Sequence, residues 1–187
     1  MRWTVFGILA YLLLLLQSSL GGILTLQIPG VGHVRPDIPA ILVVFLGLYV
    51  RDAVDAMLAG WIMGFAIDLT TGAGPGVSTV VGPMSLSYAL GAGAIFVLRE
   101  VVFREKLLTR CIMTLVFCLL SHGTWVTLQW LLAFRTAPWG GYLQMLVQVV
   151  LVALYTGALT PLAHLTLGRG PRWLSPWIAE PPRLGRR

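Results

Sequence analysis

Four stretches of this chain contain no Asp, Glu, Lys or Arg, and each is long enough to cross a lipid bilayer. They cover residues 3–34, 69–98, 111–134 and 136–168. An α-helix spans the hydrocarbon layer of a bilayer with about 20 apolar residues. Only 11% of all residues are charged and the mean hydropathy is +0.85, whereas a soluble domain is about 25% charged. The composition therefore excludes a soluble globular domain and indicates an all-α integral membrane protein.

The apolar runs between the charges predict six membrane helices, which form a single domain over residues 1–168. Arg51 and Asp52 divide two of these runs, and one continuous helix would place both charges near mid-membrane at a high energetic cost. We therefore expect two short helices joined by a charged turn. The fourth helix is expected to kink at Gly82–Pro83, and a charged loop over 99–110 precedes the fifth. The predicted helices cover about 3–20, 36–50, 53–67, 77–98, 111–134 and 142–167.

The basic residues sort to one side of such a bundle. If the N-terminus is cytoplasmic, 11 of the 13 Lys and Arg residues fall in cytoplasmic segments, and only Arg35 and Arg135 lie outside. The positive-inside rule expects this bias for an even number of crossings. The chain is thus predicted to lie in the inner (plasma) membrane with both termini in the cytoplasm. Its basic charge is explained by orientation and anionic lipid, so it gives no support for a nucleic-acid partner.

Residues 169–187 form a basic tail that contains tryptophan. Tryptophan beside arginine suits the headgroup zone of an anionic leaflet. We expect this tail to lie on the cytoplasmic membrane surface, although a solvated tail is the alternative. The predicted surface anchors are Arg172, Trp173 and Trp177.

A small-residue stripe, formed by Ala56, Gly60, Gly64 and Asp68, repeats every four residues along the third predicted helix. Small residues let two helix backbones approach closely, so the stripe is a candidate either for packing inside the bundle or for contact with a partner. Asp68 is expected to accept backbone N–H bonds from the loop that follows. That loop has the composition of a turn, and its turn residues are Gly72, Gly74, Pro75 and Gly76.

Polar side chains gather on the last two predicted helices, and they indicate either hydrogen bonds between helices or a polar cavity or partner groove. They are Ser121, His122, Thr124, Thr127, Gln129, Gln144 and Gln148. The sequence contains no metal-ligand spacing, no phosphate-binding lysine motif and no serine or aspartate pattern of an intramembrane protease. We therefore predict a protein that is not an enzyme and has no cofactor, no metal and no catalytic residue.

Three segments carry a resemblance to a known family. Arg35-Pro36-Asp37-Ile-Pro39 opens an apolar helix, the run from Gly60 to Leu69 reads Gly-x3-Gly-x3-Asp-Leu, and Gly72-Ala-Gly-Pro-Gly76 follows. This order resembles the rod-shape-determining protein MreD family of bacteria. The resemblance covers about Arg35 to Gly91, and the last two helices match only in hydropathy.

The resemblance implies a non-enzymatic inner-membrane scaffold of the cell-elongation machinery that supports peptidoglycan synthesis. It also implies MreC as the main partner, then RodA with its penicillin-binding transpeptidase and MreB, and no soluble substrate. We expect the small-residue stripe to receive the transmembrane helix of MreC.

The MreD family is similar in fold to the substrate-binding subunits of energy-coupling-factor transporters. A small-molecule-binding subunit of that type is therefore the alternative. Such subunits carry an Ala-x3-Ala docking motif on the first helix, whereas this chain has a leucine run over 12–16 there.

Overall fold

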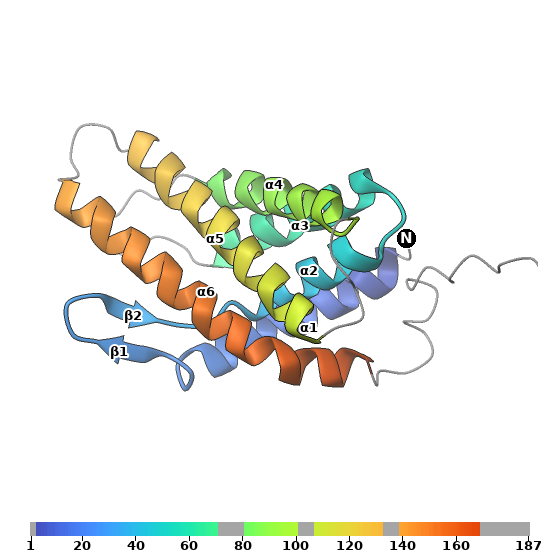
Figure 1. Cartoon of the computed structure of the whole chain (residues 1–187), viewed down its shortest axis with the longest axis horizontal. Coiled ribbons are helices and arrows are strands. Elements are labelled where there is room, and N and C mark those ends of the chain that lie inside the picture. The colour runs from blue at the N-terminus through green and yellow to red at the C-terminus, as the bar shows by residue number, and fades with distance from the viewer. Residues whose placement is uncertain (1–2, 71–80, 101–106, 133–138, 169–187) are drawn as a thin grey trace, which may run out of the picture.

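A short helix that is apolar on every face lies at the centre of the fold. In the computed structural model, which describes residues 3–70, 81–100, 107–132 and 139–168, this helix is α2 (Ile38–Tyr49), and ten of its 12 residues are buried. A helix without a polar face must be covered all round. It is in contact with five further helices, as Figure 1 shows: α1 (Trp3–Gly21), α3 (Ala53–Thr70), α4 (Pro83–Leu98), α5 (Leu107–Leu132) and α6 (Trp139–Gly168).

Helix length separates these six helices into two groups. Four of them (α1, α3, α5 and α6) are long and apolar enough to cross a membrane, whereas α2 and α4 have 12 and 16 residues. The predicted class of a helical membrane protein agrees with this architecture, and six crossings remain a prediction. α2 rises only about 18 Å along its axis, and the residue at its N-terminal end, Asp37, is buried inside the bundle.

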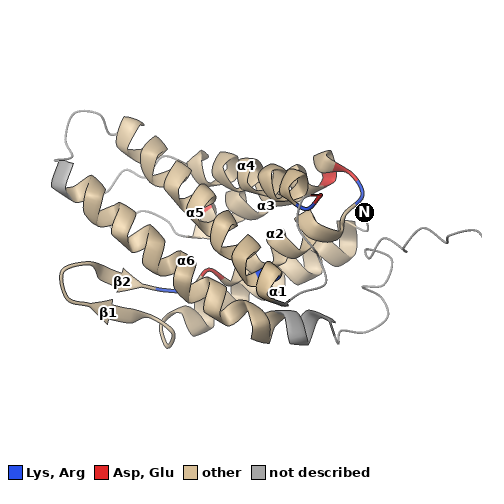
Figure 2. Cartoon of the chain, viewed as in Figure 1, with Lys and Arg blue, Asp and Glu red and all other residues tan. Residues whose placement is uncertain are grey.

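The helices alternate in direction, so that α1 begins and α6 ends at the same end of the bundle (Figure 1). The turn between α2 and α3 also lies there, and Figure 2 shows charged residues at this turn while most of the helical surface carries none. At this end the Arg99 guanidinium donates hydrogen bonds to the carbonyl oxygens of Val50 and Gly47. A cation at the end of α2 offsets the partial negative charge of the helix C-terminus.

A two-stranded antiparallel hairpin, which the sequence did not lead us to expect, joins α1 to α2. Its strands are β1 (Leu26–Ile28) and β2 (Gly32–Val34). Gly30 and Gly32 have φ angles of +84° and +104°, a backbone region that other residues rarely adopt.

Two glutamines of α6 fasten the hairpin to the bundle. The amide of Gln144 donates to the carbonyl oxygen of Gly30 at 3.0 Å, and that of Gln148 donates to the carbonyl oxygen of His33 at 2.6 Å. These glutamines therefore bond to the hairpin and not to another helix, and Gln148 also lines a cavity, which was the alternative expectation. Their acceptors are backbone carbonyl oxygens of the hairpin.

Helix ends differ from the predicted ones where a local interaction overrides the hydropathy pattern. The helix predicted from Pro36 begins at Ile38, because Asp37 caps it. Gly82 has a φ of +123°, so α4 begins at Pro83 and residues 81–82 are not helical, while residues 77–80 of the predicted helix lie outside the described residues. The fifth helix begins at Leu107 rather than at residue 111, and Arg110 in its first turn lies over the ring of Tyr49, 5.9 Å from its centroid.

Candidate functional site

A single carboxylate caps the central helix from inside the bundle. Asp37 is the N-cap of α2, and its Oδ1 accepts a hydrogen bond from the backbone N–H of Ala40 at 3.3 Å. Its own backbone N–H donates to the hydroxyl of Thr156 on α6 at 2.9 Å. The residue is only 6% exposed. A short side chain with an oxygen acceptor is the preferred N-cap, and here the capping residue also bonds to a second helix.

The second oxygen of the same carboxylate connects two more helices. Asp37 Oδ2 accepts a hydrogen bond from the phenol of Tyr88 on α4, and it lies 2.9 Å from Nε2 of His122 on α5. Tyr88 is fully buried, and its ring packs edge-on against that of Phe117 with 5.1 Å between the centroids. Both carboxylate oxygens are thus bonded within the bundle.

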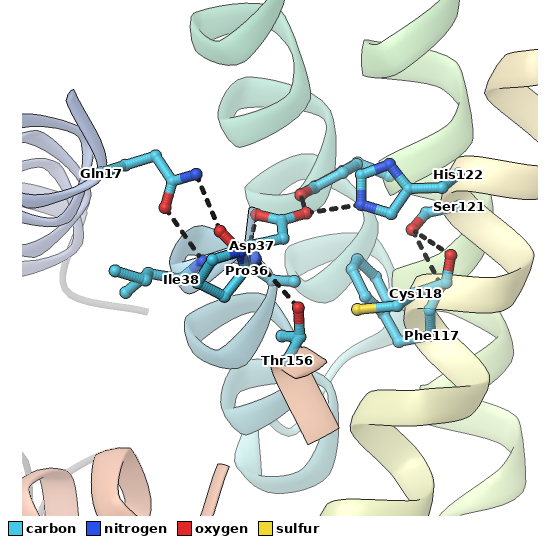
Figure 3. Close-up of polar contacts among 11 residues, drawn as sticks. Gln17, Pro36, Asp37, Ile38, Phe117, Cys118, Ser121, His122 and Thr156 are labelled. Atoms are coloured by element: carbon cyan, nitrogen blue, oxygen red, sulfur yellow. Dashed lines mark hydrogen bonds and ion pairs between the residues drawn. The ribbon is translucent and has the colours of Figure 1, made fainter. Parts of the chain in front are cut away.

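The first helix reaches the same point through an amide. Gln17 on α1 donates from Nε2 to the carbonyl oxygen of Pro36 at 3.0 Å and accepts from the N–H of Ile38 at 3.2 Å. Figure 3 shows Gln17 and His122 approaching the Asp37 segment from opposite sides, with Thr156 on a third side. We call Gln17, Asp37, Tyr88, His122 and Thr156 the polar junction. It joins α1, α2, α4, α5 and α6.

The polar junction stabilises a group that is otherwise costly inside a membrane protein. An unpaired carboxylate in a low-dielectric interior is strongly unfavourable, and buried charges are therefore paired and hydrogen-bonded. The junction supplies one hydroxyl, one imidazole and one backbone N–H to the carboxylate. Within the described residues no group of three or more His, Cys, Asp and Glu side chains is placed to hold a metal ion.

A cavity of about 700 Å³ lies beside the polar junction. The cavity exists because α2 is short. The N-terminal end of this central helix is capped by Asp37, whereas α1, α3, α5 and α6 extend past that point. The N-terminal end of α2 therefore forms one wall, with apolar residues such as Leu14, Trp125 and Val152 around it. Arg35, Asp37 and His122 also line the cavity. The volume is within the range of small-molecule sites, about 300–1,000 Å³.

Asp68 caps α4 from the end of α3. Its Oδ2 accepts backbone N–H bonds from Gly82 at 2.9 Å, Met84 at 3.2 Å and Ser85 at 3.4 Å. The expected donors in the loop over 71–80 lie outside the described residues, and the observed donors are N–H groups at the N-terminus of α4. A carboxylate there satisfies those donors and interacts favourably with the helix dipole.

The small-residue stripe of α3 packs against α4. A Cβ atom added to Gly60 would lie 2.6 Å from the carbonyl oxygen of Tyr88, and one added to Gly64 would lie 2.5 Å from that of Met84. Ala56 is fully buried as well. The packing role is therefore observed within the chain. The expectation that this stripe receives a partner's helix is wrong, because the backbone of α4 already occupies it.

Other predicted positions lie outside the described residues. These are the turn residues Gly72, Gly74, Pro75 and Gly76 and the proposed surface anchors Arg172, Trp173 and Trp177. Pro36 is described, and its carbonyl oxygen belongs to the bond with Gln17.

The polar junction is the part of the site that the sequence analysis missed. From the sequence, Asp37 was placed only in the segment that opens an apolar helix, and His122 was one of several polar residues of the fifth helix. The available signal was an acidic residue directly before an apolar helix, in a chain with only seven acidic residues.

The fold and the polar junction define a helical membrane protein whose central helix is capped by a buried carboxylate. No family model, no curated protein and no solved structure matches the chain.

Proposed function

We propose that this protein is a non-enzymatic inner-membrane scaffold of the bacterial cell-elongation machinery, with MreC as its direct partner. The observation that carries the proposal is the ordered series from Arg35-Pro36-Asp37 through Gly60 and Gly64 to Asp68, which resembles the MreD family. Spacing of this kind is more specific than hydropathy, which many unrelated membrane proteins share.

The contacts of these same residues support the proposal. Asp37 caps α2, Asp68 caps α4, and Gly60 and Gly64 bring α3 against α4. The residues that carry the resemblance therefore join α2, α3 and α4 into one unit. A scaffold needs fixed helix positions and no reacting group, and residues whose polar atoms are engaged inside the bundle suit that role.

The ends of the helices support the proposed orientation. Arg51 follows α2, Arg99 follows α4 and Arg110 lies in the first turn of α5. Because the helices alternate in direction, these three positions share one end of the bundle with the start of α1. We propose that this end faces the cytoplasm and anionic lipid. RodA, its penicillin-binding transpeptidase and MreB are the further proposed partners.

Because α4 covers the small-residue stripe of α3, we propose that MreC contacts the outward faces of the helices instead. Trp61 and Phe65 offer one such face on α3, since both are exposed and their rings stack with 5.6 Å between centroids. Replacing both with leucine changes this surface and leaves Gly60 and Gly64, which contact the backbone of α4, in place.

Co-purification tests the proposal. The tagged chain is expressed with MreC from the same organism, extracted in mild detergent and captured, with an unrelated single-pass membrane protein as the control bait. We expect MreC in the captured fraction and not with the control bait. Loss of MreC with Trp61→Leu/Phe65→Leu places the contact on α3, and absence of MreC from the unchanged chain refutes the proposal.

The cavity favours a second candidate, a small-molecule-binding subunit of an energy-coupling-factor-type transporter. Its volume of about 700 Å³ suits a small ligand. This candidate predicts a non-covalently bound small molecule in native mass spectrometry and co-purification with a transport module instead of MreC.

A further inference from the structure

Among the described residues that line the cavity beside the polar junction, the exposed side chain of Arg35 is a cation that forms no ion pair. Arg35 lies between β2 and α2 and lines the cavity, and among the described residues no carboxylate forms an ion pair with it. Its Nη1 lies 4.0 Å from the position that a Cβ would take on Gly21, at the end of α1. The guanidinium thus has the partial negative charge of a helix end nearby but no full anion.

The two carboxylates that line the same cavity are already engaged. Asp37 bonds to Tyr88, His122 and the N–H of Ala40, while Asp68 accepts the N–H groups at the start of α4. Each carboxylate also sits at a helix N-terminus, where the dipole offsets its charge. Arg35 is therefore the charged group of the cavity that is left to pair with a ligand.

The rest of the cavity wall is suited to an apolar body. Leu14, Ile67, Trp125, Val149 and Val152 line it, and they come from α1, α3, α5 and α6. Mostly apolar walls with a few polar groups that fix orientation are typical of small-molecule sites.

We propose that this cavity binds a small anionic amphiphile, whose carboxylate or phosphate pairs with Arg35 and whose apolar part lies among α1, α5 and α6. Arginine presents a planar set of donors that matches either anion in a bidentate manner. The proposal goes beyond the scaffold function and does not depend on it, because binding to the purified chain requires no partner protein.

A fluorescent probe tests the proposal on the full chain in detergent. The probe is 11-(dansylamino)undecanoic acid, and its neutral methyl ester is the matched ligand. We expect saturable binding of the acid that weakens about tenfold or more in Arg35→Gln, as for the loss of a charge-assisted hydrogen bond, with little change for the ester. Arg51→Gln, at the opposite end of α2, is the control variant and should bind the acid like the unchanged chain.

A second variant separates the site from surface binding. Val152→Trp fills the cavity, so it should abolish binding of both acid and ester. The proposal is overturned if Arg35→Gln and Arg51→Gln bind the acid equally well, or if Val152→Trp binds like the unchanged chain.

Native mass spectrometry of protein taken from its own membranes distinguishes the two sources of such an anion. A retained anion with the mass of a lipid, or with that of a soluble metabolite, supports the proposal and identifies the source. A retained neutral or cationic molecule in the cavity contradicts it.

Discussion

Substitution of Gly64 by alanine tests the observation that the small-residue stripe serves the contact between α3 and α4. The added Cβ would lie 2.5 Å from the carbonyl oxygen of Met84 and 2.8 Å from Cα of Ser85. Both are backbone atoms at the start of α4, so no side chain can rotate away. Ordinary contact at 3.4 Å requires the two helices to separate by about 0.9 Å.

The expected cost follows from overpacking. Extra methyl groups in a close-packed interior destabilise by about 1–3 kcal/mol, which lowers the melting temperature of a chain of this size by roughly 2–4 °C per kcal/mol. We therefore expect Gly64→Ala to melt on the order of 5 °C lower, measured by size-exclusion chromatography of heated detergent extracts. Movement of α4 also shifts the N–H groups that Asp68 caps, which adds to the loss.

Gly123→Ala is the matched control for this experiment. A Cβ at Gly123 on α5 meets no atom within 4 Å, and alanine has the higher helix propensity. This variant should be as stable as the unchanged chain or slightly more stable. Equal melting temperatures for Gly64→Ala and Gly123→Ala would refute the close contact between α3 and α4.

Substitutions at Asp68, Asp37 and Gln148 test the caps and the hairpin. Asp68→Ala should lower stability by about 1 kcal/mol through loss of the α4 cap. Asp68→Asn keeps an acceptor oxygen, so its stability should lie between that of Asp68→Ala and that of the unchanged chain. Equal melting temperatures for the two variants and the unchanged chain would contradict the capping role. Asp37→Ala should be more damaging, since it leaves the buried Tyr88 hydroxyl without an acceptor at a cost of about 1–3 kcal/mol, and a normal yield of folded protein would contradict this. Gln148→Leu removes one of the two bonds from α6 to the hairpin and should speed proteolysis between β1 and β2, whereas Gln129→Leu should not.

The architecture was largely predictable from the sequence because apolar length and charge position determine where helices can lie in a membrane. The turn between Val50 and Ala53 follows from Arg51 and Asp52, whose burial in one long helix would be costly. For Asp68, the sequence predicted a role as an acceptor of backbone N–H bonds, but not that the donors would be Gly82, Met84 and Ser85 at the start of α4.

Other features depend on contacts between distant residues, which one sequence does not reveal. Asp37 and Thr156 are 119 residues apart, and Asp37 and His122 are 85 residues apart. Neither pairing has a local signal. From the sequence alone, the small-residue stripe of α3 could serve either packing inside the bundle or contact with a partner. Only the position of α4 distinguishes these two roles. The start of α4 at Pro83 depends on the backbone conformation of Gly82, which hydropathy does not detect.

Depletion of the protein in its own cells is the most direct test of the proposed function. The scaffold account predicts that rod-shaped cells become wider and round as the protein is lost. It predicts that the unchanged chain and Gly123→Ala restore the rod shape, and that Asp37→Ala does not. Cells that stay rod-shaped at normal width after depletion would contradict the account.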